Sequence, residues 1–354
     1  MRMRHVASTT LAILCLHFTL YPQQVIPPAK RALPPPFETL QDSKQFEAAR
    51  FGPGNTISFV EPPPDFQLSA FAISFDGGFI AMGWASGRIE LRDLHTKSKA
   101  REFKSGFGTP QLLQFNPSGD ELVVTGSGGR ITFLHVPDGK KVREWRIPLG
   151  KYKYDVQEVV FDPHGKWLAY ADEEASKVLD LATNPPQTLA DLEDAGSLAL
   201  SQGGNELWTV DRSVLERFST GTWRQTGRWP LKSEPVNTAP VVIQAGVGPG
   251  GQGTVAVPSS KGLVIYDEHD MEGSLVTYEP TSRVVFASGS KTYVDLSKDL
   301  TLVTAEGSVL CTMSYRGGRD YAVSGDGQWL ALSQDASVDL WRVDDLLRDC
   351  STVP

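Results

Sequence analysis

A short unit of strand, turn, strand, turn and strand recurs along most of this chain, and its clearest copy runs from Phe115 to Leu134. In that copy the end of an apolar strand is followed by the turn Asn116–Gly119, an apolar run, and a turn rich in glycine and serine at 126–129. Asn and Pro favour the start of a tight turn, and glycine accepts the positive φ that closes it. Because repeats of this length indicate repeat architectures, this unit constrains the fold more than composition does.

The turn phrase returns, with changes, from residues 74, 161, 200, 296 and 323. The strand after the second turn is recognised seven times, at residues 86–94, 128–136, 175–182, 212–219, 261–268, 307–314 and 336–343. Most copies are followed by a fourth short run, and helical periodicity is almost absent. Four short strands per unit predict an all-β fold, a seven-bladed β-propeller. The last two copies begin at 307 and 336, only 29 residues apart, so blade six is expected to be thin and a six-bladed ring stays open.

The phrase F-[DN]-P-x-G at Phe115 and Phe161, together with the closing strand Val338–Val343, resembles the repeats of WD40-like β-propellers of the degenerate bacterial kind. The resemblance covers about residues 55–345. It departs from the fuller pattern, since no Gly-His pair opens each blade and the terminal Trp-Asp is reduced to Arg92–Asp93 or Trp341–Arg342. The resemblance implies the propeller fold, and it does not carry any one function with it.

Residues 1–21 have the layout of a signal peptide, because Arg2 and Arg4 precede an apolar run from Val6 to Tyr21. The run is short for a membrane span. No good cleavage site follows it, so an uncleaved N-terminal membrane anchor is the alternative. We therefore expect an exported protein, periplasmic or secreted.

Residues 22–54 are rich in proline and are predicted to form a linker, with a short helix over Glu38–Arg50. Residues 55–345 would form the propeller and residues 346–354 a C-terminal tail. A propeller whose last blade lacks a strand leaves an open edge. The run Asn55–Glu61 is predicted to supply that strand from the N-terminal side.

Two cysteines, Cys311 and Cys350, lie outside the leader. In an oxidising compartment such an even pair can form a disulfide, and two free thiols are the alternative.

Loops between second and third strands meet on one rim of a propeller, although they are far apart in sequence. The residues of these loops form a candidate interaction rim, made of Trp84, Asp172, Glu173, Glu174, Asp211, Arg212, Glu306 and Asp335. An acidic rim would attract a basic protein partner, and an exposed Trp can anchor one. A plain solvated rim is the simpler interpretation. A cation site is less favoured, because no loop has the spacing of a calcium loop.

The sequence gives little support for cofactor binding, catalysis, metal binding or nucleic-acid binding. Gly246–Gly251 fits G-x-G-x-x-G, but a strand follows it instead of the helix that would hold a pyrophosphate, so no cofactor is predicted. Outside the leader His95, His135, His164 and His269 fall on different repeats, and G-x-S-x-G is absent, so no catalytic residue and no metal site is predicted. The net charge of −8 and the lack of a basic patch argue against nucleic acid.

These observations predict a non-catalytic, monomeric propeller that acts as a platform for a protein partner in the cell envelope or outside the cell. One alternative is a propeller-type hydrolase, similar to a lactonase or glycosidase, that uses the rim carboxylates. Another is a periplasmic accessory of an envelope complex, similar in type to TolB-like propellers. A central funnel with converged carboxylates would favour the enzyme.

Overall fold

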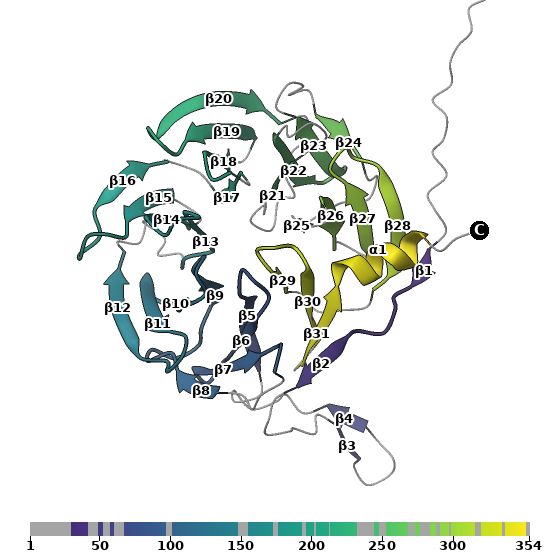
Figure 1. The fold of residues 1–354 in the computed structure, drawn as a ribbon, viewed down its shortest axis with the longest axis horizontal. Coiled ribbons are helices and arrows are strands. Elements are labelled where there is room, and N and C mark those ends of the chain that lie inside the picture. The colour runs from purple at the N-terminus through teal and green to yellow at the C-terminus, as the bar shows by residue number, and fades with distance from the viewer. Residues whose placement is uncertain are drawn as a thin grey trace, which may run out of the picture.

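Seven sheets of four or five strands stand around a common axis like the blades of a propeller (Figure 1). The computed structural model describes residues 30–41, 49–51, 57–59, 67–96, 101–147, 155–172, 176–192, 196–201, 203–211, 213–231, 244–247, 253–267, 273–276, 284–287, 291–296, 299–315, 320–334 and 337–351. These residues form strands β1 to β31 and a single helix, α1. The prediction of an all-β propeller is confirmed.

The strands of each blade follow one another in the chain. Blades one to four consist of β5–β8 (Leu68–Ile73, Phe79–Trp84, Arg88–Asp93, Arg101–Lys104), β9–β12 (Leu112–Phe115, Glu121–Gly126, Arg130–His135, Lys141–Arg146), β13–β16 (Glu158–Phe161, Trp167–Ala171, Ser176–Asp180, Thr188–Asp191) and β17–β20 (Ser197–Leu200, Glu206–Asp211, Val214–Ser219, Arg224–Pro230). Blades five to seven consist of β21–β24 (Gln244–Val247, Gly253–Ser259, Gly262–Asp267, Ser274–Leu275), β25–β28 (Val284–Ala287, Thr292–Asp295, Leu300–Thr304, Val309–Ser314) and β29–β31 (Tyr321–Val323, Trp329–Gln334, Ser337–Arg342). The first strand of blade seven, β29, contacts the first strand of blade one, β5, so the ring is closed.

Antiparallel pairing within each blade sends alternate loops to opposite sides of the ring. We call face A the side that carries the loops between first and second strands and between third and fourth strands, such as Ser118–Asp120. Face B carries the loops between second and third strands, such as Ser127–Gly129, and the connections between blades.

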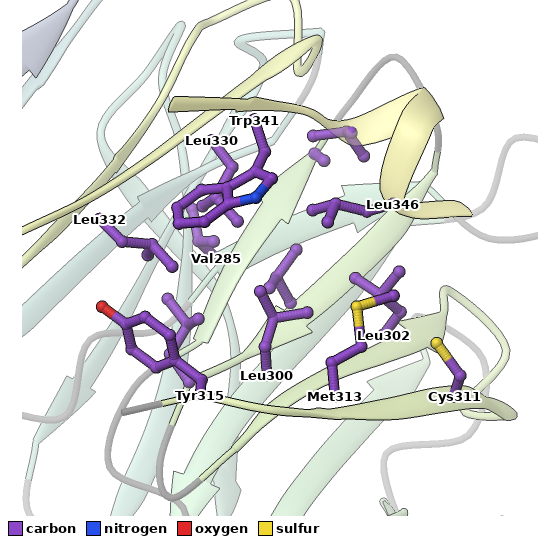
Figure 2. Packing of buried hydrophobic residues seen from close by; sticks show 14 residues of the cluster. Val285, Leu300, Leu302, Cys311, Met313, Tyr315, Leu330, Leu332, Trp341 and Leu346 are labelled. Carbon is purple, nitrogen blue, oxygen red and sulfur yellow. The ribbon is translucent and has the colours of Figure 1, made fainter. Parts of the chain in front are cut away.

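The buried apolar side chains that the structure describes form seven clusters, each between two neighbouring blades. Since successive side chains of a strand point to opposite faces, Val123 packs toward blade three while Val124 packs toward blade one. Figure 2 shows the cluster between blades six and seven, where Leu302 and Leu332 come from the two blades and Leu346 comes from α1.

Blade six is a full sheet, so the six-bladed alternative is excluded. Residues 307–314 were interpreted as a third strand, but they contain β28, which is the fourth. The third strand is β27, and the turn phrase from Leu296 precedes it instead of preceding the second strand. The interval of 29 residues was misleading because β27 and β28 both carry buried apolar residues, and either resembles a third strand.

An N-terminal strand completes blade seven, as predicted, but different residues supply it. Strand β2 (Glu38–Gln41) pairs antiparallel with β31 as the outermost strand of that blade. Ahead of it, β1 (Arg31–Ala32) pairs in parallel with β28 at the outer edge of blade six. The propeller therefore begins near Arg31, inside the segment that was predicted to be a linker.

Two further expectations for this segment are wrong. The stretch assigned as the closing strand contains β4 (Ile57–Phe59), which pairs with β3 (Ala49–Phe51) in a separate two-stranded hairpin. The helix expected over Glu38–Arg50 is replaced by strands at both of its ends. Pairing with β31 gives Glu38–Gln41 backbone partners along one edge, and such tertiary contacts override weak helix propensity.

The C-terminal residues form the helix α1 (Val343–Ser351) and not a tail. Val343 and Leu346 are fully buried between blades six and seven, and a disulfide joins Cys350 to Cys311 of β28. The Cα atoms of the two cysteines are 5.7 Å apart, within the usual range for a disulfide. Val343, Leu346 and Cys350 are spaced i, i+3 and i+7, which places them on one helix face. In the described part of the chain, no helix has both the length and the apolarity that crossing a membrane requires.

Candidate interaction surface

Trp84 and Asp172, two members of the predicted rim, are buried at the face B ends of their strands. Trp84 is 0% exposed, and the guanidinium of Arg88 covers its ring at 4.8 Å from the centroid. Asp172 is 2% exposed. Trp84 therefore cannot anchor a partner in this conformation, because packing between blades seven and one encloses it.

Of the other predicted rim residues, only Glu306 has a side chain that the structure describes, and it does not lie on the same face as Asp172. Glu306 follows β27, the third strand of blade six, so it lies exposed on face A, whereas Asp172 lies on face B. Asp211 is the last residue of β18. The members that lie outside the described residues, or whose side chain does, are Glu173, Glu174, Asp211, Arg212 and Asp335.

Face A carries an exposed aromatic side chain that the sequence pattern did not reveal. Phe75 is 53% exposed in the first turn of blade one, where the equivalent positions of blades two and three hold Pro117 and Pro163. Its ring lies over Gly325 of blade seven, because a Cβ at that glycine would collide with the ring. The amide of Asp326 donates to the carbonyl of Phe75 at 2.8 Å. An apolar residue inside an otherwise polar turn was the signal that could have identified it.

Carboxylates in the first turns of blades one and two, on face A, are held in the ionised form by donors of their own turns. The Ser74 hydroxyl donates to Asp76 at 2.7 Å and the Gly78 amide at 2.9 Å, which lowers the pKa of Asp76. In blade two, hydrogen bonds from Ser118 and Asn116 lower the pKa of Asp120 in the same way.

Two further carboxylates on face A are Asp93, which ends the third strand of blade one, and Asp138, which lies in the turn after the third strand of blade two. The amides of Thr96 and His95 donate to Asp93 at 2.9 and 2.8 Å and lower its pKa. His135 Nδ1 lies 2.8 Å from Asp138 and, with Lys140, lowers the pKa of that carboxyl. All four carboxylates of this region therefore stay negative at neutral and mildly acidic pH.

A groove of about 370 Å³ opens on face A between blades one and two. Its lining includes the apolar side chains of Phe79, Leu91 and Val136, of which the last two are buried. The turn Ser118–Asp120 borders it, and Asp93 and Arg101 also line it. Arg101 donates to the carbonyl of Pro137, so the outer strand of blade one is tied to the turn of blade two.

The carboxyl of the half-buried residue Glu158 differs from those on face A, because its pKa is raised instead of lowered. Glu158 begins β13 at face B, and it accepts bonds from the Ser197 hydroxyl at 2.9 Å and the Leu198 amide at 2.8 Å, so it bridges blades three and four. Burial raises the pKa of Glu158 from 4.5 to about 7. The folded state therefore binds this proton more tightly than the unfolded chain.

This shift predicts a pH dependence. The contribution of Glu158 to stability is complete below pH 4.5, declines as pH rises toward 7, and is lost above it. Glu158→Gln keeps an acceptor for Ser197 without the charge, so it should match the native protein near pH 4.5 and exceed its free energy of unfolding by about 1–2 kcal/mol at pH 8. Urea unfolding between pH 4.5 and 8 measures the difference. Asp155→Asn is the matched control on face B, where Asp155 binds Gln111 at 2.8 Å. A constant difference between Glu158→Gln and native across this range would contradict the assignment.

Histidines that could serve in a catalytic triad remain apart. His95, His135 and His164 lie on face A in three successive blades, and His269 is outside the described residues. The later part of the glycine motif, residues 248–251, also lies outside them. Among the residues that the structure describes, no group of three or more His, Cys, Asp or Glu side chains could hold a metal ion.

Fold and surface together define a seven-bladed β-propeller with an aromatic and acidic region on one face. No family model matches the chain, and no curated protein matches it in sequence. Among solved structures, the chain is similar to the β-propeller domain of Cps50 (Swd1) from Myceliophteria thermophila, with a TM-score of 0.61 and 14% identity, over 78% of this chain and 96% of that domain. At this identity the likeness shows the fold, which many unrelated functions share.

Proposed function

We propose that this protein is a non-catalytic platform for protein interaction and that its binding surface is face A around Phe75. The observation that carries the proposal is an aromatic side chain, 53% exposed, on a turn held by hydrogen bonds of its own blade and by blade seven. Aromatic anchors on rigid supports dominate the energy of many interfaces, because little conformational entropy is lost on binding.

Charge around Phe75 supports a partner with a basic contact surface. Asp76 is the next residue, and Asp326 belongs to the neighbouring turn of blade seven, where the Ser324 hydroxyl holds it. Fixed carboxylates beside an exposed ring attract cationic groups and fix the orientation of the partner. The sequence offered a basic protein partner as one interpretation of the acidic rim on face B, and we propose that such a partner binds face A instead.

The alternative of a hydrolase required rim carboxylates to converge. Of that set, Asp172 is buried at face B and Glu306 is exposed at face A, so these two cannot act at one reaction centre. The platform therefore has the better support from the described residues.

We place the platform outside the cytoplasm, in the periplasm or in the medium. The positive n-region and apolar run of residues 1–21 support export, and the Cys311–Cys350 disulfide fits an oxidising compartment. Whether the leader is cleaved or remains as an anchor is decided by N-terminal sequencing of protein from the soluble and membrane fractions. A role as an accessory of an envelope complex is one form of this proposal.

A photo-crosslinking amino acid in place of Phe75 tests the binding surface. We expect a covalent adduct with a distinct partner from an envelope extract, and no such adduct from Leu189, which is 43% exposed on β16. Phe75→Ser should weaken capture of that partner at least tenfold, because a central aromatic anchor contributes about 1.4 kcal/mol or more. Circular dichroism checks that the variant is folded. The same adduct at both positions, or undiminished capture by Phe75→Ser, would overturn the proposal.

A further inference from the structure

The groove on face A between blades one and two combines an apolar floor with two carboxylates. We propose that it holds an arginine or lysine side chain of an extended segment of the partner protein. This inference rests on the proposed function, since it names the chemistry by which the platform would recognise its partner.

The apolar lining of the groove can pack against the methylene groups of a lysine or arginine side chain. Leu91 and Val136 are each 3% exposed and line the groove from two different blades, with Phe79 beside them. Lysine and arginine lay their methylene groups along apolar surface and keep the charge in a polar setting. The volume of about 370 Å³ leaves room for such a side chain and the backbone next to it.

Charge within the groove selects a cation. Asp93 and Asp120 line it from blades one and two, and hydrogen bonds that lower the pKa of each keep both carboxylates ionised. The hydrogen bonds from Asn116 and Ser118 both reach Oδ1 of Asp120, so Oδ2 can accept a bond from a guanidinium or ammonium group. An anionic ligand would meet two carboxylates against the single guanidinium of Arg101.

Rigidity makes the groove ready for its ligand. The Asp120 turn is closed by hydrogen bonds from Gly119 to Asn116 and from Asn116 to Glu121, at 3.0 and 2.9 Å. On the other side, Arg101 links the two blades through the carbonyl of Pro137. Binding therefore needs little rearrangement of the groove, so little conformational entropy is lost when the ligand binds.

The test uses two fluorescent peptides, dansyl-Leu-Arg-Leu-Arg-Leu-amide and the same peptide with citrulline in place of arginine. Citrulline has nearly the same shape without the charge. Fluorescence anisotropy should show that the native protein binds the arginine peptide at least tenfold more tightly at 50 mM salt, and that 300 mM salt weakens this binding. Equal binding of the two peptides would overturn the inference.

Variants separate the carboxylates from the rest of the groove. The double variant Asp93→Asn with Asp120→Asn should bind the arginine peptide no better than the citrulline peptide. Ser118→Lys places a cation beside Asp120 and should also abolish binding while both carboxylates stay present. Thermal melting confirms that each variant is folded. Native affinity in the double variant or in Ser118→Lys would contradict the inference.

Failure of this inference is distinguishable from failure of the proposed function. If the groove variants lose no partner while Phe75→Ser does, the platform stands and the groove is not its contact. If the peptide result holds while position 75 yields no specific adduct, the groove binds cations and the surface around Phe75 is not the interface.

Discussion

Deleting residues 30–41 should abolish cooperative unfolding of the propeller, because this segment supplies the outermost strand of two blades. Without it, β28 and β31 lose their neighbours β1 and β2 and expose unpaired backbone groups at the edges. The segment is also held by side chains. Trp341 donates from Nε1 to the carbonyl of Pro34 at 3.1 Å, Thr39 donates to Asp339 at 2.7 Å, and Lys30 pairs with Asp299 at 2.6 Å.

A single substitution in β2 tests the packing of this segment against the propeller without removing the strand. Leu40 is 1% exposed and packs in the cluster between blades seven and one, so Leu40→Ala should lower the free energy of unfolding by about 3 kcal/mol. Differential scanning calorimetry of both changes measures the loss.

The hairpin of β3 and β4 provides the control for these changes. Within the described part of the chain, these two strands pair only with each other, so replacing residues 49–59 by a Gly/Ser linker of equal length should leave the melting transition nearly unchanged. A native melting curve for the 30–41 deletion, or equal losses from the two replacements, would show that β2 does not close the ring.

Breaking the Cys311–Cys350 disulfide should have the second largest effect. The two residues are 39 apart in sequence, and the chain-entropy model gives about 3–4 kcal/mol for a loop of this length. The bond fixes the end of α1 to β28, where Arg31 of β1 also donates to the carbonyl of Asp349. Its loss should therefore loosen the C-terminal helix and the first strand together.

Cys350→Ala is the suitable variant, since Cys350 is less buried than Cys311, which is 1% exposed. Its melting temperature should fall below that of the native protein and should not respond to dithiothreitol, whereas the native protein should melt earlier when reduced. Hydrogen exchange should locate the change in α1, β1 and β28. A native protein that melts identically with and without reductant would refute the stabilising role.

Face B offered the stronger sequence signal for a binding surface, yet face A has the better structural support. Clusters of acidic residues such as Asp172–Glu174 are visible in the sequence, whereas burial is not. The position of the Phe75 ring depends on Gly325, which lies 250 residues away in sequence and leaves room for the ring. Likewise, Asp93 and Asp120 meet in one groove only because blades one and two stand side by side.

The repeating unit, the all-β class and the ring could be predicted from the amino-acid sequence, because turns such as Asn116–Gly119 and the alternation of apolar residues act over a few neighbours. The strand that closes the ring could be identified only in the folded protein. An outermost strand is held mainly by backbone hydrogen bonds, so Glu38–Gln41 needs only Leu40 as a buried apolar residue and gives no alternating signal. Tertiary structure also decided the register of blade six, and with it the face on which Glu306 lies. Local propensity cannot settle which strand closes the ring, since β2 pairs with β31, whose Asp339 lies 300 residues from Thr39 along the chain.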